Sequence, residues 1–396
     1  MKIVHVCTFG TYTDSFSYQE NVLPRYHADM GHDVTVIAQN KAFDYSGKIV
    51  DFDEQKYTDE YGVQIIRVCY KKYIFKTITD VFSYARIFKY LKTINPDLIF
   101  VHDAQLTTLT YFDIRKYCNR INPSCIVFGD VHADIYNTSP NKKNIFKKSF
   151  LHFYKYLFFK KVIPIYKKIY CVAQSCLEYA EAVLKIPSEK LDLLPLGFDD
   201  KLLICKDRDS IRHSLRTKYH LADDDIIVVH GGKLDSKKKT IELIQAISNI
   251  GNKKIKLFIF GGVSECYFNE LFAAIEKNDF VYYFGPLKPS EYYDLYLSSD
   301  IAVFPGGQSA IWQEAIGCGL PLVVYYRNGM TEYLNRCGNA AFFCNQDVDS
   351  IKLKLIELLN YNCLRQMKDA AAKASSFFSY KNSARRIMND YYYFKR

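Results

Sequence analysis

The sequence predicts an α/β protein of two domains, each a parallel β-sheet covered by helices on both faces. The chain has 396 residues, more than one hydrophobic core usually serves, so two domains of roughly 200 residues are expected. Short apolar runs rich in β-branched residues alternate with longer helical patterns along the whole chain, which is typical of parallel sheets. A segment with Pro195 and Gly197 separates the two series of strands and provides a natural hinge.

The elements follow in order along the chain. In the first half, the expected strands cover residues 3–8, 33–38, 65–68, 98–102, 126–128 and 169–173. In the second half they cover residues 226–230, 256–260, 281–284, 301–304 and 322–325, with helices over 241–250, 267–277 and 290–298. We therefore expect an N-terminal domain over residues 1–196, a C-terminal domain over 197–378 and a closing amphipathic helix over 379–396.

Composition excludes several classes of protein. No stretch of 18 uncharged apolar residues exists, and Met1-Lys2 leads directly into a strand instead of a signal sequence. The twelve cysteines lack metal-ligand spacing, and several lie in apolar strands. This pattern predicts reduced structural cysteines in a cytoplasmic protein, without a zinc site or a disulfide framework.

Positive charge is concentrated in residues 142–168, which contain nine lysines, no acidic residue and many aromatic side chains. A basic, aromatic, amphipathic segment suits the headgroup layer of an anionic membrane. Single-stranded nucleic acid would suit the same residue types, but no nucleic-acid motif occurs elsewhere. A helix with core aromatics and solvated lysines is the remaining alternative. We expect a peripheral protein on the inner face of the plasma membrane and no nucleic-acid partner.

The most informative segment covers residues 304–324. An expected strand ends at a turn containing Gly306 and Gly307, and Ser309 stands where a helix N-cap is expected, beside Gln308. Glycines let backbone approach a ligand closely, and a helix start favours an anion. Glu314 lies too far along that helix to cap it, so its carboxylate is expected to accept hydrogen bonds from hydroxyls.

A second glycine turn follows the strand 226–230. It contains Gly232, Lys233 and Lys238 at a strand C-terminus, where ligands bind in open α/β sheets. Two cations beside a pyrophosphate would offset the charge that develops as a nucleoside diphosphate leaves. A basic surface turn is the alternative.

In the first half, Ser17 and Glu20 have the spacing of a capping box and predict a helix start. Asp130 and His132 are expected just after a strand, where they could orient an acceptor hydroxyl or accept its proton. His102 and Asp103, after the preceding strand, are further candidates for the acceptor side. A structural histidine is the alternative at either position.

A metal site is a further possibility in the first half. Asp130, His132 and Asp134 form a D-x-H-x-D cluster, which can bind a metal ion. This cluster resembles part of the calcineurin-like metallophosphoesterase pattern. That family's other motifs are absent here, so we expect no metal.

The segments together resemble family 4 glycosyltransferases, which have two Rossmann-like domains facing each other across a cleft, the GT-B fold. Glu314, Ala315, Gly319 and Pro321 match the second half of that family's E-x7-E…A-x-x-x-G-x-P pattern, whereas Gly306 stands where the first glutamate is expected. Residues 232–239 match its G-[RK]-L-x-x-x-K-G pattern except at the last position. Residues 18–37 are similar to the opening of bacterial polysaccharide glycosyltransferases.

The resemblance implies a role for each matched segment. Lys233 and Lys238 would hold the donor pyrophosphate, Glu314 would bind the ribose, and the turn at Gly285 would contact the base. Gly10 would bring backbone close to the donor phosphates, although the family's double glycine is here a single one. In this fold the closing helix usually crosses back to pack on the first domain.

We therefore expect a retaining, metal-independent glycosyltransferase. It would move a sugar from a nucleoside diphosphate donor, with UDP favoured over GDP, to a glycan or polyprenyl-linked acceptor in bacterial surface polysaccharide synthesis. Two alternatives stay open. One is a GT-B binding or regulatory protein that has lost catalysis, which the missing glutamate favours, and the other is a GT-B nucleotide-sugar epimerase.

Overall fold

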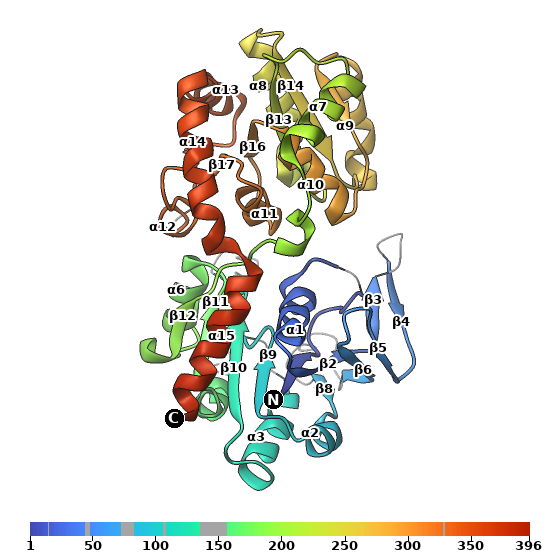
Figure 1. The fold of residues 1–396 in the computed structure, drawn as a ribbon, viewed down its shortest axis with the longest axis vertical. Coiled ribbons are helices and arrows are strands. Elements are labelled where there is room, and N and C mark those ends of the chain that lie inside the picture. The colour runs from blue at the N-terminus through green and yellow to red at the C-terminus, as the bar shows by residue number, and fades with distance from the viewer. Residues whose placement is uncertain (15, 44–47, 73–82, 106–107, 135–156, 328) are drawn as a thin grey trace, which may run out of the picture. The chain divides into compact units, whose positions relative to one another are not determined.

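The structure is a computed structural model that describes residues 1–14, 16–43, 48–72, 83–105, 108–134, 157–327 and 329–396. The chain forms two compact units (Figure 1). The first comprises Met1–Pro195 with Ser383–Arg396, and the second comprises Leu196–Asn382. Both are α/β units with a parallel sheet, as the sequence predicts.

The first unit is built on an eight-stranded sheet. Its order is β12 (Leu191–Leu193), β11 (Lys168–Cys171), β10 (Ile126–Val131), β9 (Leu98–Val101), β1 (Lys2–Cys7), β2 (Asp33–Gln39), β6 (Gln64–Val68) and β5 (Gln55–Thr58). Every pairing is parallel except that of β5 with β6. Two hairpins, β3 (Lys41–Phe43) with β4 (Ile49–Asp51) and β7 (Tyr70–Lys72) with β8 (Ser83–Ala85), lie beside it.

Helices complete the first unit. They include α1 (Gln19–Asp29), α2 (Phe88–Ile94), α3 (Thr110–Arg120), α6 (Gln174–Ala182) and the closing helix α15 (Tyr380–Lys395). The Tyr170 hydroxyl donates a 2.6 Å hydrogen bond to Asp390, and Arg386 donates one of 2.7 Å to the Leu193 carbonyl. These contacts hold α15 along β10 to β12 (Figure 1).

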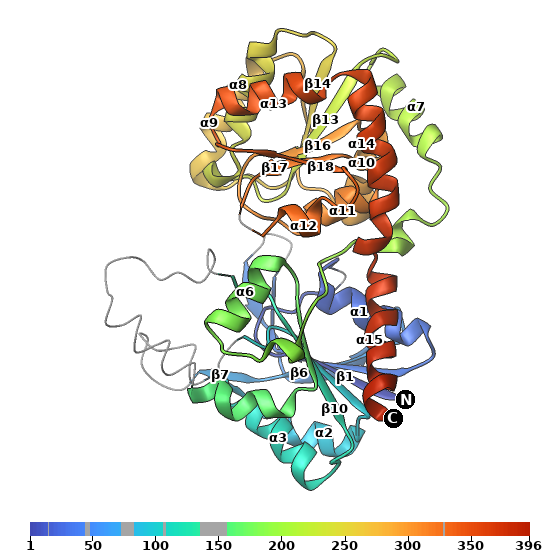
Figure 2. The same cartoon turned by 90° about the vertical axis from the view of Figure 1, so that its left-hand side faces the viewer.

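The second unit has a six-stranded, wholly parallel sheet. Its order is β15 (Val281–Tyr283), β14 (Ile255–Phe260), β13 (Ile226–Gly231), β16 (Ile301–Phe304), β17 (Leu322–Tyr325) and β18 (Ala340–Phe343). The helices are α7 (Arg208–Lys218), α8 (Thr240–Ile250), α9 (Glu265–Glu276), α10 (Pro289–Ser298), α11 (Ile311–Gly317), α12 (Thr331–Leu334), α13 (Val348–Leu358) and α14 (Tyr361–Ala374). Figure 2 shows α8 and α13 on one face of this sheet and α11 on the other. An apolar core fills the space between the strands and α8, α9 and α13.

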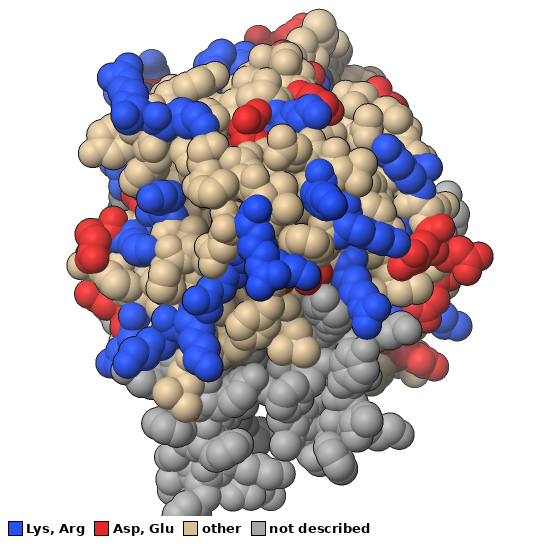
Figure 3. Space-filling view, turned by 90° about the horizontal axis from the view of Figure 1, so that it is seen from below, with Lys and Arg blue, Asp and Glu red and all other residues tan. Residues whose placement is uncertain are grey.

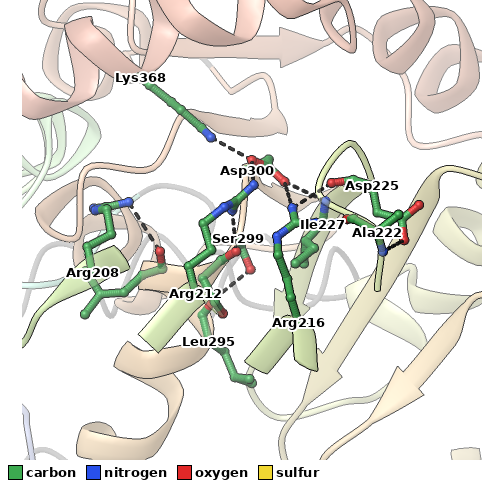
Figure 4. A network of polar contacts seen from close by, with 12 residues as sticks. Arg208, Arg212, Arg216, Ala222, Asp225, Ile227, Leu295, Ser299, Asp300 and Lys368 are labelled. Atoms are coloured by element: carbon green, nitrogen blue, oxygen red, sulfur yellow. Dashed lines mark hydrogen bonds and ion pairs between the residues drawn. The ribbon is translucent and has the colours of Figure 1, made fainter. Parts of the chain in front are cut away.

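One carboxylate anchors α7 in the second unit (Figure 4). Asp300, 6% exposed, accepts the Ile227 backbone N–H at 2.8 Å and pairs with Arg212 at 2.8 Å, Lys368 at 2.6 Å and Arg216 at 3.6 Å. Burial raises the pKa of Asp300, but the charges of Lys368 and Arg212 outweigh it and lower the pKa overall. A single ionised side chain thus joins α7, α14 and the start of β13.

Two helix starts differ from the sequence prediction. Helix α1 begins at Gln19 with Tyr18 as its N-cap residue, so Ser17 and Glu20 do not form the expected capping box. Helix α11 begins at Ile311 with Ala310 in the N-cap position, so Ser309 is not a cap and Glu314 falls in the first turn. Both predictions placed the helix start one residue too early.

No helix within the described ranges is long and apolar enough to cross a membrane. Most of residues 142–168, predicted to contact a membrane, lie outside the described residues, which resume at 157. In the described part, Phe158, Phe159 and Tyr166 are buried core side chains, while Lys160 and Lys161 face solvent. These three aromatic side chains therefore pack in the core of the first unit.

Candidate active site

Apart from Gly10, which lines a pocket of the first unit, the predicted donor residues lie at the carboxyl ends of the second sheet. Gly232 follows β13, and Gly261 follows β14 with a φ of 123°. A Cβ atom on Gly261 would lie 1.8 Å from the Gly232 carbonyl oxygen, so only glycine lets these turns pack together. The Gly285 carbonyl accepts a 2.7 Å hydrogen bond from the Gly261 N–H. The predicted base-contact turn therefore adjoins the predicted phosphate turn.

The lysine turn and the glycine turn after β16 are in direct contact. A Cβ atom on Gly306 would lie 2.3 Å from the Lys237 carbonyl oxygen. The Gly307 N–H donates to that carbonyl at 3.3 Å, and Lys238 Nζ donates to the Gly307 carbonyl at 3.2 Å. The structure thus brings together two segments that lie almost 70 residues apart in the sequence.

Sequence reasoning missed Arg327, which follows β17 at the same edge of the sheet. Its guanidinium lies 3.7 Å from where a Cβ atom on Gly307 would stand. Burial lowers the pKa of Lys238, the charge of Asp235 raises it, and the charge of Arg327 lowers it. Two cations beside a glycine turn create a local field that favours an anion. A basic residue two positions after a parallel strand was the signal available in the sequence.

The remaining donor candidates differ in accessibility. Lys233 is exposed, as the predicted contact with a pyrophosphate requires. Gln308 donates from Nε2 to the Tyr333 hydroxyl at 3.4 Å, and its buried Oε1 has no protein partner among the described residues. Ser309 lies beside Gly232, and Glu314 is 3% exposed. The roles expected for these residues stay predictions.

In the first unit, the four predicted acceptor-side residues converge. Asp130 lies within β10 instead of after it, and His132 follows the strand. Asp130 Oδ2 is 2.8 Å from His102 Nδ1, and Oδ1 is 3.1 Å from His132 Nε2. Asp130 Oδ1 also accepts the Asp103 backbone N–H at 2.7 Å. Asp130 is thus the centre of this cluster.

A small pocket opens beside this cluster at the ends of β1 and β9. It is lined by Cys7, Phe9, Gly10, Thr11, Tyr12, Glu20, His102 and Asp103. Glu20 is a pocket residue that the capping-box interpretation missed, and burial raises its carboxyl pKa. Gln105, also missed, donates to Asp103 at 2.7 Å and accepts the His132 N–H at 3.1 Å. Two carboxylates and an imidazole in one pocket, with the Gln105 amide bonded to one of the carboxylates, suit a ligand rich in hydroxyls.

The D-x-H-x-D pattern does not form a metal centre in the described part of the chain, where no three Cys, His, Asp or Glu side chains have the arrangement of metal ligands. Asp130 instead pairs with His132 and His102, and Asp134 Oδ2 lies 3.5 Å from the Ser175 hydroxyl. None of the twelve cysteines forms a disulfide.

The whole fold is similar to that of solved glycosyltransferase structures. Sucrose-phosphate synthase of Thermosynechococcus elongatus superposes with a TM-score of 0.69 at 14% identity, covering 99% of this chain and 98% of that one. HepE of Anabaena, in complex with UDP and glucose, gives 0.65 at 15% identity, with 98% and 99% covered. WaaG, a glycosyltransferase involved in lipopolysaccharide biosynthesis, gives 0.63 at 14% identity, with 97% and 99% covered.

Family models identify the two halves of the chain. Residues 23–202 match the model of Glycosyltransferase Family 4, and residues 212–375 match that of Glycosyl transferases group 1. No curated protein sequence matches the chain. The chain belongs to the GT-B glycosyltransferases and is a transferase enzyme.

Proposed function

We propose that this glycosyltransferase moves a sugar from a uridine diphosphate donor to a saccharide acceptor carried on a polyprenyl lipid. The reaction would retain the anomeric configuration, need no metal ion, and serve bacterial surface polysaccharide synthesis. The donor site is supported by one observation, the contact between the lysine turn and the turn at Gly306 and Gly307. Arg327 lies at the same carboxyl edge of the second sheet. HepE of Anabaena, which has the same fold, has been crystallised with UDP and with UDP-glucose.

Each donor residue would act on a particular part of the nucleotide sugar. Lys238, Arg327 and the exposed Lys233 would neutralise the pyrophosphate as the leaving group gains charge. Gln308 would use its buried Oε1 to accept a hydrogen bond from a hydroxyl of the sugar. Glu314 would bind the ribose, and the turn at Gly285 would contact the base.

Substitution of Lys238 by Met tests the donor site in a calorimetric titration with UDP. Removing a charge-assisted hydrogen bond costs about 1.5–3 kcal/mol, so Kd is expected to rise about 10- to 150-fold. Lys237→Met is the matched control, because that side chain belongs to the same turn and is exposed. Equal UDP affinity of the two variants would remove Lys238 from the donor site.

The acceptor part of the proposal is supported by a basic surface on the first unit, which we call the α2–α3 surface. Its exposed cations are Arg86, Lys89, Lys92, Arg115, Lys116 and Arg120. Asp113 is the single acidic residue in these two helices, and it is buried, accepting the N–H groups of Ile87 and Phe88. Phe112 and Ile121 are each 40% exposed beside the cations. Lys and Arg side chains are spread widely among uncharged residues on the face seen in Figure 3.

Anionic vesicles test whether this surface binds a membrane. Replacing Lys89, Lys92, Arg115 and Lys116 with Gln should weaken binding to phosphatidylglycerol vesicles, because each cation near such a surface contributes roughly 1 kcal/mol. Phosphatidylcholine vesicles should bind weakly before and after the change. Replacing Lys253 and Lys277, exposed lysines of the second unit, should have little effect. Unaltered partitioning of the four-residue variant would contradict the membrane proposal.

A further inference from the structure

Five side chains of the first unit form a continuous row of contacts that leads from α1 to the candidate acceptor pocket. His27 Nδ1 lies 3.0 Å from His5 Nε2, and His5 Nδ1 lies 3.0 Å from His102 Nε2. His102 Nδ1 is 2.8 Å from Asp130 Oδ2, and Asp130 Oδ1 is 3.1 Å from His132 Nε2. We call His27, His5 and His102 the histidine relay.

The histidine relay and Asp130 are buried, whereas His132, on the other side of Asp130, is partly exposed. His5 and His27 are fully buried, His102 is 4% exposed and Asp130 is fully buried, but the side chain of His132 is 27% exposed. Burial lowers the pKa of His5 well below its usual value and lowers that of His27 to about 3. Both imidazoles are therefore neutral at physiological pH, each with one N–H donor and one acceptor nitrogen.

The carboxylate and a neutral His102 together fix the direction of every hydrogen bond in the relay. An ionised Asp130 can only accept, so the His102 proton facing it is on Nδ1. If His102 is neutral, its Nε2 must accept from Nδ1–H of His5, and His5 Nε2 must accept from Nδ1–H of His27. The series ends at His27, whose Nε2 has no protein hydrogen-bond partner among the described residues, while the backbone of Ala384 lies near the ring and raises its pKa. The geometry thus selects the same Nδ1–H tautomer three times.

One cation is needed to balance Asp130, and two histidines contact it. His132 is better placed than His102 to carry this positive charge, because its partly exposed ring loses less hydration than the buried ring of His102. Asp103 and Glu20 also face His132 and add negative potential. Burial lowers the pKa of His132, but the charge and hydrogen bond of Asp130 outweigh it and raise the pKa to about 10.

We propose that the histidine relay holds Asp130 ionised and His132 as an imidazolium, so that His132 donates a hydrogen bond to bound substrate and does not accept a proton. His5, His27 and His102 are then positioning residues that act through Asp130. That the substrate oxygen belongs to a sugar rests on the proposed function; the protonation states do not. A proton released by an acceptor hydroxyl would go to another group, and Glu20 is the carboxylate of the pocket with a raised pKa.

Nitrogen-15 NMR of the full chain labelled at histidine tests these protonation states without any ligand. Multiple-bond spectra distinguish the two neutral tautomers and the imidazolium. The expected spectrum has neutral Nδ1–H imidazoles from His5 and His27 that do not change between pH 6 and 9. His102 should carry a proton on Nδ1, the nitrogen that faces Asp130, and none on Nε2. His132 should have both nitrogens protonated across that range.

Single substitutions to Gln assign the signals, and His230 serves as an internal control. It is also fully buried, and its Nδ1 is 2.8 Å from the Val303 carbonyl in the second unit, so it should be a neutral Nδ1–H imidazole unaffected by changes in the first unit. In Asp130→Asn, His132 should lose its extra proton near or below the usual pKa of about 6.5. If that variant does not fold, the wild-type spectrum alone still shows whether His132 is an imidazolium and which tautomers the relay histidines adopt.

Two results would overturn the proposal: a neutral His132 at pH 7.5, or Nε2–H tautomers at His5 and His27 with a cationic His102. Because the spectrum is recorded without nucleotide, this failure is distinct from failure to bind UDP.

Discussion

Gly306 is the residue at which backbone packing most directly shapes the donor site. It stands where related enzymes have the first glutamate of their E-x7-E pattern, and a side chain there would collide with the Lys237 carbonyl and with Lys238 Cα. A glutamate at this position would need the two turns to separate. The departure from the family pattern therefore has a physical reason, which is the close approach of the lysine turn.

Gly306→Ala is expected to destabilise the protein by about 1–3 kcal/mol, because the added methyl group overpacks a backbone contact. Urea unfolding measures the change. Gly262→Ala is the matched control, since no atom lies within 4 Å of the Cβ atom it would introduce. If both variants unfold at the same urea concentration, the contact between the turns is not as close as described.

At the scale of elements, apolar patterns predicted most strands, because buried parallel strands are continuous apolar runs. The sequence prediction ended one strand at residue 128, whereas β10 continues to Val131. Gly129 and Asp130 interrupt the apolar run, but contacts with residues distant in the sequence keep them in the strand. A Cβ atom on Gly129 would lie 2.9 Å from Tyr166, and the buried Asp130 is satisfied by two histidines. Local patterns cannot reveal either contact.

Asp300→Asn tests the anchoring of α7 in the second unit. The change leaves Arg216 and Arg212 facing a neutral group, and the expected cost is roughly 2–4 kcal/mol, reduced because Arg212 and Lys368 are partly exposed. Asp279→Asn, at an exposed position of the same unit, is the control. Chemical unfolding followed by tyrosine fluorescence and circular dichroism measures both, and equal stabilities would contradict the anchoring role.

The same ion pairs predict a pH dependence. The folded-state pKa of Asp300 is depressed, so its contribution is present above the usual aspartate pKa of about 3.9 and is lost as pH falls through the lower folded value. The stability difference between wild type and Asp300→Asn should therefore shrink in acid.

At the scale of the whole molecule, length, alternating elements and the Pro195 hinge region were enough to predict two α/β units. The chain divides between Pro195 and Leu196, and its closing helix joins the first unit from Ser383 onward. Motifs singled out Lys238, Gly306, Asp130 and His132 as candidates because those residues follow or end strands, and their roles stay predictions.

Other residues of the two sites could not be predicted from spacing. Arg327, Glu20 and the histidine relay join residues that only the tertiary fold brings together. His5 and His102, for example, are 97 positions apart.

The central claim is that the second unit binds the pyrophosphate of a uridine nucleotide donor. Calorimetric titration of the full chain with UDP, and in parallel with UMP and GDP, tests it most directly. The account predicts that UDP binds and that UMP binds at least about tenfold more weakly, since a lost charge-assisted contact to the second phosphate costs about 1.5 kcal/mol or more. GDP should bind more weakly than UDP. Equal affinity for UMP and UDP, or no binding of any nucleotide, would contradict the claim.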